Sequence, residues 1–276
     1  MGPVLLCYDG SHHADRAARL AGTLLRPRQA VVLHIPQKPF KPAVAVSGRQ
    51  VALDAGFDPI AVVETGHGRI ATAVLAHART HDASVIVVGS HDGARSRSLV
   101  HRTDRPVLVC PPAAPPSSAN EPIFMCYDGS PGARQALAAA GNLLAGRAAI
   151  VAGFVPAVDD LTLLRSSLPW LAAAEVQDGL ARLDREEAEV PAERAIEGAR
   201  TAATAGFVAR PVGIPGADAS SEEEDEPWRR LLRAAADEDA ACIVLGHRPS
   251  AKGLASAADG LLREADRPLL VVPAGP

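Results

Sequence analysis

The chain contains the same module twice, and this repetition constrains its fold more than any other feature. Residues 4–11 read VLLCYDGS, and residues 123–130 read IFMCYDGS. Two further pairs of segments match near the far end of each copy: 82–89 with 239–246, and 103–109 with 265–271. The spacing is much longer than the repeat of about 20 to 50 residues that builds a solenoid. The sequence therefore predicts two whole domains.

Length and composition agree with two globular domains. A chain of 276 residues has room for about two domains. Aromatic residues make up only 3% of the chain, so the cores must be built from Val, Leu, Ile and Ala. The segment 111–120 is rich in Pro, Ala and Ser and has no periodicity, which is typical of a linker. We predict a first domain at 1–112, a linker at 113–121 and a second domain at 122–276.

The sequence also favours a cytoplasmic protein. No apolar run approaches the roughly 20 residues of a membrane-spanning helix, and the N-terminus lacks the regions of a signal peptide. Cys7, Cys110, Cys126 and Cys242 show no CxxC spacing and lie in or beside apolar runs. We expect them to be free, buried thiols, as in a reducing compartment.

The two halves carry opposite net charges. Residues 1–120 have 13 Lys and Arg against 8 Asp and Glu, whereas residues 121–276 have 15 against 24. Opposite charges on tethered domains favour the docking of one on the other; unrelated drift of two solvated surfaces gives the same numbers. The basic excess of the first half is too small to indicate a nucleic-acid partner.

Each copy alternates short apolar runs with helix-like stretches, which is typical of an α/β fold with a parallel sheet. Near-continuous apolar runs such as 85–88 indicate strands that are covered on both faces. In the first copy we predict strands at 4–8, 30–35, 59–64, 84–88 and 107–110, and helices at 13–25, 70–80 and 96–102.

The second copy is longer, and its additions fall in two main places. Helical patterns at 160–168 and 170–183, with a charged segment over 192–203, lie in an insertion at 159–203. This insertion either docks a partner or covers the sheet of its own domain. The acidic stretch at 217–226 is typical of a solvated loop, with a regulatory or partner-binding tail as the alternative.

These motifs resemble the universal stress protein family. Both copies have a strand that ends in Asp-Gly-Ser, a later strand that ends in Gly, and a closing Asp-Arg-Pro followed by an apolar run. The resemblance implies a stress-response protein in which each domain is an open five-stranded parallel sheet with helices on both faces, of the adenine nucleotide alpha hydrolase-like type. It also implies that the last strands, 107–110 and 269–272, pair within the chain as a pseudo-dimer, with further homodimerisation as an option.

Members of this family that bind ATP carry Gly-x-x-Gly, nine residues, and then Gly-Ser/Thr after the fourth strand. Glycines let backbone N–H groups approach phosphate oxygens, and an acidic residue ends the first strand. Both copies keep the acid, but neither keeps a complete loop: the first is shortened, and the second has Pro249, which has no N–H, in place of a glycine. The residues that remain as a candidate nucleotide crevice are Asp9, Gly89, Gly93, Asp128, Gly246 and Ser256.

Eight of the nine histidines lie in the first copy. His12, His13 and His91, with His34 and His67, follow strands whose carboxyl ends meet at one sheet edge. Imidazole and carboxylate groups suit Zn²⁺, so a metal site and a pH-responsive crevice are two interpretations. Solvated loop histidines are the third, and we expect no metal.

The sequence holds no convincing nucleophile or acid–base pair, and we expect no enzyme, apart from weak ATP hydrolysis by family analogy. Ser11 and Ser130 are predicted to cap the helices that follow them. Two functions stay open. The first, which the damaged loops favour, is an interaction or regulatory module for an unknown protein partner. The alternative is a protein that binds ATP, another adenine nucleotide or another small ligand in one crevice.

Overall fold

In a computed structural model, the described residues of the first half form an α/β unit of five strands and four helices. The structure describes residues 2–26, 28–35, 42–63, 69–90, 94–144, 146–154, 174–214, 226–247 and 254–274. The strands are β1 (Val4–Cys7), β2 (Gln29–His34), β3 (Asp58–Val63), β4 (Val85–Gly89) and β5 (Val107–Cys110). The helices are α1 (His12–Leu24), α2 (Pro42–Asp54), α3 (Ile70–Thr80) and α4 (Ala94–Val100).

The second half repeats this order. Its strands are β6 (Ile123–Tyr127), β7 (Ala148–Gly153), β8 (Val208–Gly213), β9 (Cys242–His247) and β10 (Leu269–Pro273). Its helices are α5 (Pro131–Leu144), α7 (Ala174–Thr204), α8 (Pro227–Asp237) and α9 (Leu254–Glu264).

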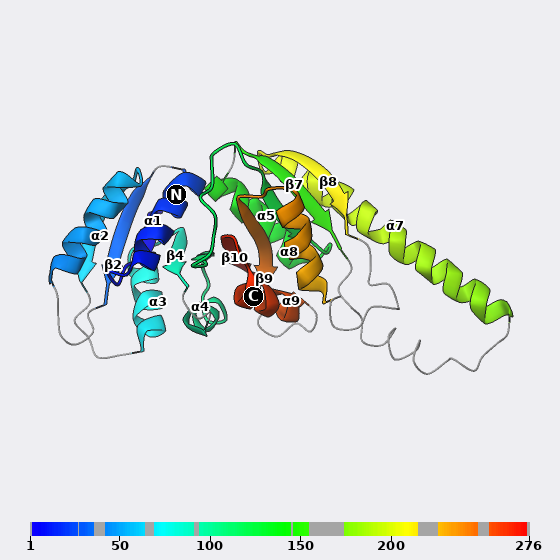
Figure 1. Cartoon of the computed structure of the whole chain (residues 1–276), viewed down its shortest axis with the longest axis horizontal. Coiled ribbons are helices and arrows are strands. Elements are labelled where there is room, and N and C mark those ends of the chain that lie inside the picture. The colour runs from blue at the N-terminus through cyan, green and yellow to red at the C-terminus, as the bar shows by residue number, and fades with distance from the viewer. Residues whose placement is uncertain are drawn as a thin grey trace.

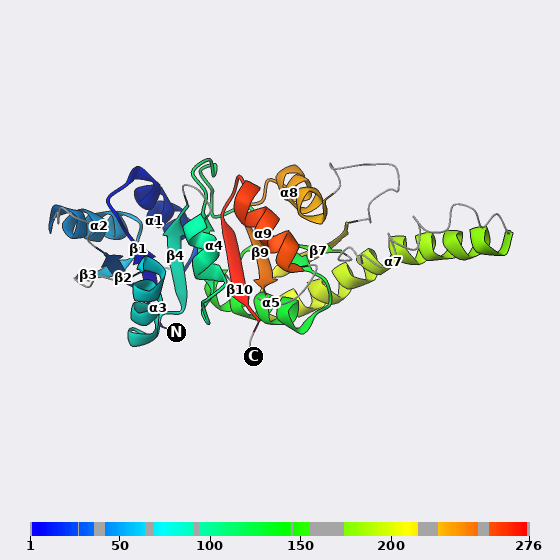
Figure 2. The same cartoon turned by 90° about the horizontal axis from the view of Figure 1, so that it is seen from below.

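All ten strands form one sheet, in the order β3-β2-β1-β4-β5-β10-β9-β6-β7-β8 (Figures 1 and 2). Every neighbouring pair is parallel except β5 and β10, which pair antiparallel with Leu108 opposite Leu270. The order is therefore symmetric about this central pair. The predicted fold class, two open parallel α/β units with helices on both faces, is confirmed.

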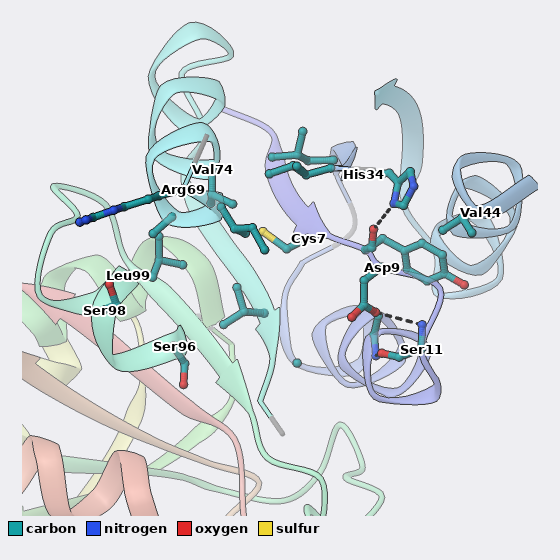
Figure 3. A pocket seen from close by; sticks show the side chains of 18 of the residues that line it. Cys7, Asp9, Ser11, His34, Val44, Arg69, Val74, Ser96, Ser98 and Leu99 are labelled. Atoms are coloured by element: carbon teal, nitrogen blue, oxygen red, sulfur yellow. Dashed lines mark hydrogen bonds between the residues drawn. The ribbon is translucent and has the colours of Figure 1, made fainter. Parts of the chain in front are cut away.

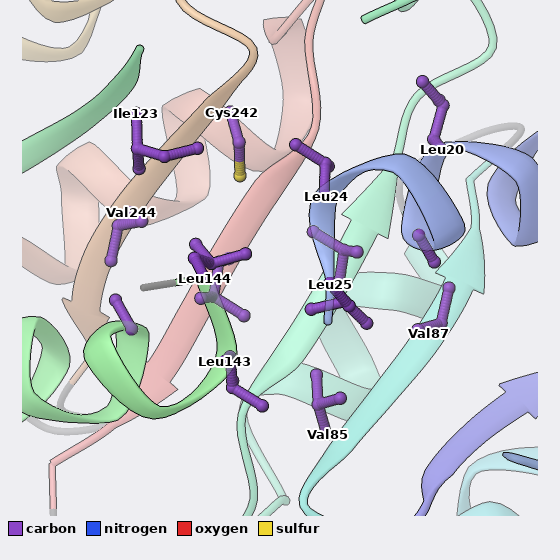
Figure 4. Close-up of a cluster of buried hydrophobic side chains, with 14 of the residues drawn as sticks. Leu20, Leu24, Leu25, Val85, Val87, Ile123, Leu143, Leu144, Cys242 and Val244 are labelled. Atoms are coloured by element: carbon purple, nitrogen blue, oxygen red, sulfur yellow. The ribbon is translucent and has the colours of Figure 1, made fainter. Parts of the chain in front are cut away.

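Two apolar cores lie on the two faces of the sheet, and each runs through both halves. The first packs α1, α2, α5 and α7 against the sheet, and the second packs α3, α4, α8 and α9. Figure 4 shows Leu24 and Leu25 of the first half beside Leu143 and Leu144 of the second. Because strand side chains alternate between faces, strands buried on both sides must be apolar throughout.

The linker is held against both halves. Ala114 is fully buried in the first core. Arg147, which precedes β7, donates through Nη2 to the carbonyl oxygens of Ser118 at 2.7 Å and of Thr23 at 3.3 Å. Arg147 thus ties the linker and the end of α1 to the second half.

The predicted strands of the first half are confirmed to within one residue, but one helix was not predicted and the insertion was divided wrongly. No helix was expected at α2, because its apolar residues lie on both faces: Val46 and Leu53 are exposed while Ala45 and Ala52 are buried. The insertion was expected as separate segments, whereas 174–204 is one helix with Pro191 inside it. The patterns at 160–168 and the acidic residues 217–225 lie outside the described residues.

The helix α7 is the counterpart of α2 with an N-terminal extension. Ala192–Thr204 corresponds to Pro42–Asp54, because Ala55-Gly-Phe recurs as Ala205-Gly-Phe. The extension projects beyond the edge of the sheet (Figures 1 and 2). Within the described segments, no helix combines the length and the apolar character that crossing a membrane requires.

Candidate functional site in the first half

A cavity of about 810 Å³ lies at the carboxyl ends of β1, β2 and β4 (Figure 3). β1 is the strand at which the chain order reverses, since β2 lies on one side of it and β4 on the other. Open α/β sheets bind ligands at such a point. The first turns of α1 and α3, together with α4, complete the walls.

Asp9 lines this cavity, in a tight turn between β1 and α1. Its Oδ1 accepts a hydrogen bond from the backbone N–H of Ser11 at 2.9 Å, and Gly10 has a φ of 80°, which favours glycine. The Ser11 Oγ accepts from the N–H of Ala14 at 3.2 Å, so the predicted N-cap is confirmed. The turn therefore holds the Asp9 carboxylate at the edge of the sheet.

His34 lines the cavity from the end of β2 and is almost fully buried. Its Nδ1 lies 2.9 Å from the carbonyl oxygen of Tyr8, which only accepts, so Nδ1 carries the proton. A neutral imidazole in this tautomer presents Nε2 as an acceptor. His34 thus offers a ligand an acceptor of fixed orientation.

Two arginines line the end of the cavity that is formed by α3 and α4. Arg69 directly precedes α3, and no side chain caps that helix. Arg102 follows α4, and its Nη2 donates to the Thr72 Oγ1 at 3.1 Å. Sequence reasoning missed both arginines, because neither lies in the family's ATP motif. The available signal was that Arg69 directly precedes the predicted helix 70–80 and Arg102 ends the predicted helix 96–102.

The middle of the cavity is apolar. Figure 3 shows Cys7, Val74 and Leu99 between the arginine end and Asp9. Burial, and secondarily the charge of Asp9, raises the pKa of the Cys7 thiol to about 12. The thiol is therefore neutral at physiological pH and behaves as part of the apolar wall.

The other predicted nucleotide residues do not all converge on this cavity. Gly89 lines it, but a Cβ there would lie 2.8 Å from the carbonyl oxygen of His13, so packing alone requires the glycine. In the second half, a Cβ at Gly246 would lie 2.6 Å from the carbonyl oxygen of Gly132. The remaining candidates are placed as follows: Asp128 accepts from the Ser130 N–H at 3.0 Å, Ser256 lies on α9, and Gly93 lies outside the described residues.

The histidines do not gather into a metal site in the part of the chain that the structure describes. His12 and His13 begin α1, with ring centroids 4.4 Å apart. No group of three His, Cys, Asp or Glu residues suited to a metal ion occurs among the described residues. His67 and His91 lie outside them.

The equivalent crevice of the second half is built differently. Gly153 stands in the place of His34, and a Cβ there would lie only 2.0 Å from the Pro191 carbonyl oxygen of α7. Arg194 stands in the place of Val44, and its Nη1 donates to the Phe154 carbonyl oxygen at 2.9 Å. The helix α7 therefore closes down on the end of β7, and an arginine crosses the space that is apolar in the first half.

Comparisons with known proteins agree with this architecture. A model of the Universal stress protein family matches residues 1–111 and 119–273. A universal stress protein from Archaeoglobus fulgidus DSM 4304 has a TM-score of 0.63 and 16% identity, with 99% of this chain and 98% of that chain covered. A functionally unknown protein from Pseudomonas aeruginosa PAO1 has a TM-score of 0.53 and 14% identity, with coverages of 99% and 92%. A comparison with curated proteins gave no match.

Proposed function

Because the chain belongs to the universal stress protein family, we propose that it is a stress-response protein whose first half binds a small anionic ligand in the crevice at Asp9. An adenine nucleotide is the first candidate for this ligand. We further propose that the second half packs against the first as a second subunit would in a dimer. The protein then binds its ligand without catalysing a reaction. A cytoplasmic location stays a prediction, supported by four free cysteines.

The cavity of the first half is the observation that carries this proposal. Its volume of about 810 Å³ falls within the range of roughly 300 to 1,000 Å³ that is usual for small-molecule sites. Such sites are mostly apolar, with a few polar groups that fix orientation. Asp9, His34 and the two arginines provide those groups around the apolar middle.

The charges indicate how an anionic ligand would be oriented. Arg69 and Arg102 lie at the end formed by α3 and α4, and guanidinium groups match the geometry of phosphate and carboxylate oxygens. The Asp9 carboxylate lies at the other end of the cavity, where it would accept hydrogen bonds from hydroxyl or amine groups of the ligand. We therefore propose that arginines take the role that a glycine-rich loop has in the family's ATP binders.

The alternative function, an interaction or regulatory module, rests on a different observation. The extension of α7 projects beyond the sheet, away from the first half (Figure 1). A projecting helix is a means of engaging a partner. The two functions are compatible, because they use opposite ends of the molecule.

Isothermal titration of the purified protein with ATP, ADP and AMP tests the ligand proposal. We expect one site per chain, and a loss of about tenfold to a hundredfold in affinity for Asp9→Ala, since a hydrogen bond to a charged group contributes roughly 1.5 to 3 kcal/mol. Asp128→Ala is the matched control, because Asp128 makes the same turn in the second half. Arg102→Ala should weaken ATP more than adenosine.

These measurements distinguish which half holds the site and which of the two functions applies. Binding that is lost in Asp128→Ala but retained in Asp9→Ala would place the site in the second half. An absence of binding for all three nucleotides, with no small molecule co-purified, would leave the interaction module.

A further inference from the structure

Three side chains form a continuous hydrogen-bonded chain between the two halves. Asp259 of α9 lies with Oδ1 3.1 Å from Nε2 of His101, the residue that follows α4. The Nδ1 of His101 lies 3.0 Å from Nε2 of His247, the last residue of β9. The side chains of His101 and Asp259 are 35% and 34% exposed, whereas His247 is 1% exposed. His101 is therefore accessible to protons from solvent, whereas His247 is buried.

The proton positions of this chain follow from its geometry. A carboxylate only accepts, so the Nε2 of His101 carries a proton. In a neutral ring, the Nδ1 of His101 is then an acceptor, and the Nε2 of His247 must donate to it. Two neutral rings thus form an unbroken series of donors from His247 through His101 to Asp259.

A first and a second added proton affect this arrangement differently. If His101 gains a proton on Nδ1, His247 has to turn into an acceptor and carry its own proton on Nδ1. That Nδ1 is buried and has no hydrogen-bond partner among the described residues in either tautomer, so the first proton only reverses which ring donates, and both hydrogen bonds of the chain are kept. If both rings are charged, two N–H groups face each other and the bond between the rings is lost.

The chain of side chains also touches the proposed ligand site. α4 is short, and Leu99 and Arg102, on either side of His101 in the sequence, line the first-half cavity. His101 therefore ties a wall of that cavity to the second half. A change at His101 would be transmitted through one short helix rather than through the whole domain.

We propose that Asp259, His101 and His247 form a protonation-dependent latch between the two halves, which holds α4 in place while at least one of the two histidines is neutral and releases it on acidification, when both rings are charged. The effect on ligand affinity rests on the function proposed above; the latch itself does not. His101 is here a positioning residue for Leu99 and Arg102.

The expected direction with pH follows from the burial of His247. Burial, and then the facing His101, lowers the pKa of His247, while Asp259 opposes this shift. A histidine whose pKa is lowered in the folded state contributes stability above its ordinary value of about 6.5 and loses it as the pH falls below that value. Other titratable or charged side chains on or beside the elements packed against His101 are Arg69, His77, Arg79, Arg97, Arg102, Arg263 and Glu264.

Hydrogen exchange of the full chain at pH 7.5 and 5.5, corrected for intrinsic rates, tests the latch without any ligand. We expect the protection of α4 and α9 to be lower at pH 5.5 than at pH 7.5, by up to about tenfold, because pH 5.5 lies about one unit below the ordinary histidine pKa of about 6.5. His101→Gln and His247→Gln should remove this pH dependence, and His81→Gln, a histidine outside the latch, should keep it. The same pH dependence in wild type and in His101→Gln would overturn the latch, even if His247→Gln fails to fold.

Titration with ATP at both pH values tests the coupling to the ligand site. We expect the affinity of the wild type to fall about tenfold more between pH 7.5 and 5.5 than that of His101→Gln, a comparison that cancels the titration of the phosphate itself. Equal losses would overturn the coupling. If ATP binds at neither pH, the proposed function fails, and the exchange experiment still decides the latch.

Discussion

At the scale of the residue, each half buries a tyrosine directly before its Asp-Gly-Ser turn, and each tyrosine donates to a carboxylate. Tyr8 donates to Asp15 of α1 at 2.6 Å, and Tyr127 donates to Glu197 of α7 at 2.8 Å. Arg134 occupies the position of Asp15 in the second half and donates to the same Glu197 at 2.8 Å. Burial and the carboxylate raise the pKa of both phenols. Both halves thus pair the buried tyrosine with a carboxylate, which comes from α1 in the first half and from α7 in the second.

Cys7 supplies a prediction at this scale. Its pKa of about 12, against an ordinary value of 9.0, leaves about a thousandfold less thiolate at neutral pH. We expect Ellman's reagent at pH 7.5 to label the native protein at least roughly a hundredfold more slowly than free cysteine. All four thiols should react in denaturant, since all four cysteines are free. A fast native reaction that disappears in Cys7→Ser would contradict a neutral Cys7 thiol.

At the scale of the element, a glycine in each half lets a helix lie directly on the tyrosine ring. A Cβ at Gly48 of α2 would lie 2.6 Å from Cδ1 of Tyr8, and one at Gly198 of α7 would lie 2.7 Å from Cγ of Tyr127. Neither contact leaves room for a methyl group. These two glycines are therefore set by tertiary packing, against their poor helix propensity.

Gly198→Ala tests this packing. Helix propensity alone would stabilise the variant by about 1 kcal/mol, but overpacking against a buried ring costs about 1 to 3 kcal/mol. We expect a net loss of stability in urea unfolding. Ala203→Gly, at an exposed position in the last turn of the same helix, should lose no more than about 1 kcal/mol from propensity alone. A Gly198→Ala variant more stable than wild type would show that α7 does not pack against Tyr127 in this way.

At the scale of the whole molecule, the central pair β5–β10 joins two α/β units into one sheet with shared cores. Leu108 and Leu270 lie opposite each other and are fully buried. Without the other half, β5 would be an edge strand of the first half and β10 an edge strand of the second. We therefore expect the two halves to unfold as one cooperative unit.

Leu270→Ala tests that expectation. Truncation of a buried leucine costs about 2 to 5 kcal/mol, and the shared core transmits the loss to both halves. Circular dichroism and tryptophan fluorescence, which reports the second half because both tryptophans lie there, should show one coincident, lowered transition. Val208→Ala, 81% exposed on the edge strand β8, should change stability by less than about 0.5 kcal/mol. Two separated transitions in the wild type would refute the single unit.

The features that the sequence determined by itself are local or repeated. Apolar runs between turn residues predicted the five strands of the first half, and the Asp-Gly-Ser turns predicted caps at Ser11 and Ser130 that both form. Two copies of one pattern implied two similar units. Each of these depends on neighbouring residues only, so no tertiary information was needed.

The tertiary structure decided which crevice stays open and what lies in it. Arg69 and Arg102 come from different elements, and only the packing of α3 beside α4 brings them to one cavity. Gly153 takes the place of His34 in the second half, where α7 packs directly on the end of β7 and leaves no room for a side chain. His101 and His247 are 146 residues apart and meet only across β5–β10. Contacts of this kind depend on how whole elements pack, and no periodicity in the sequence records them.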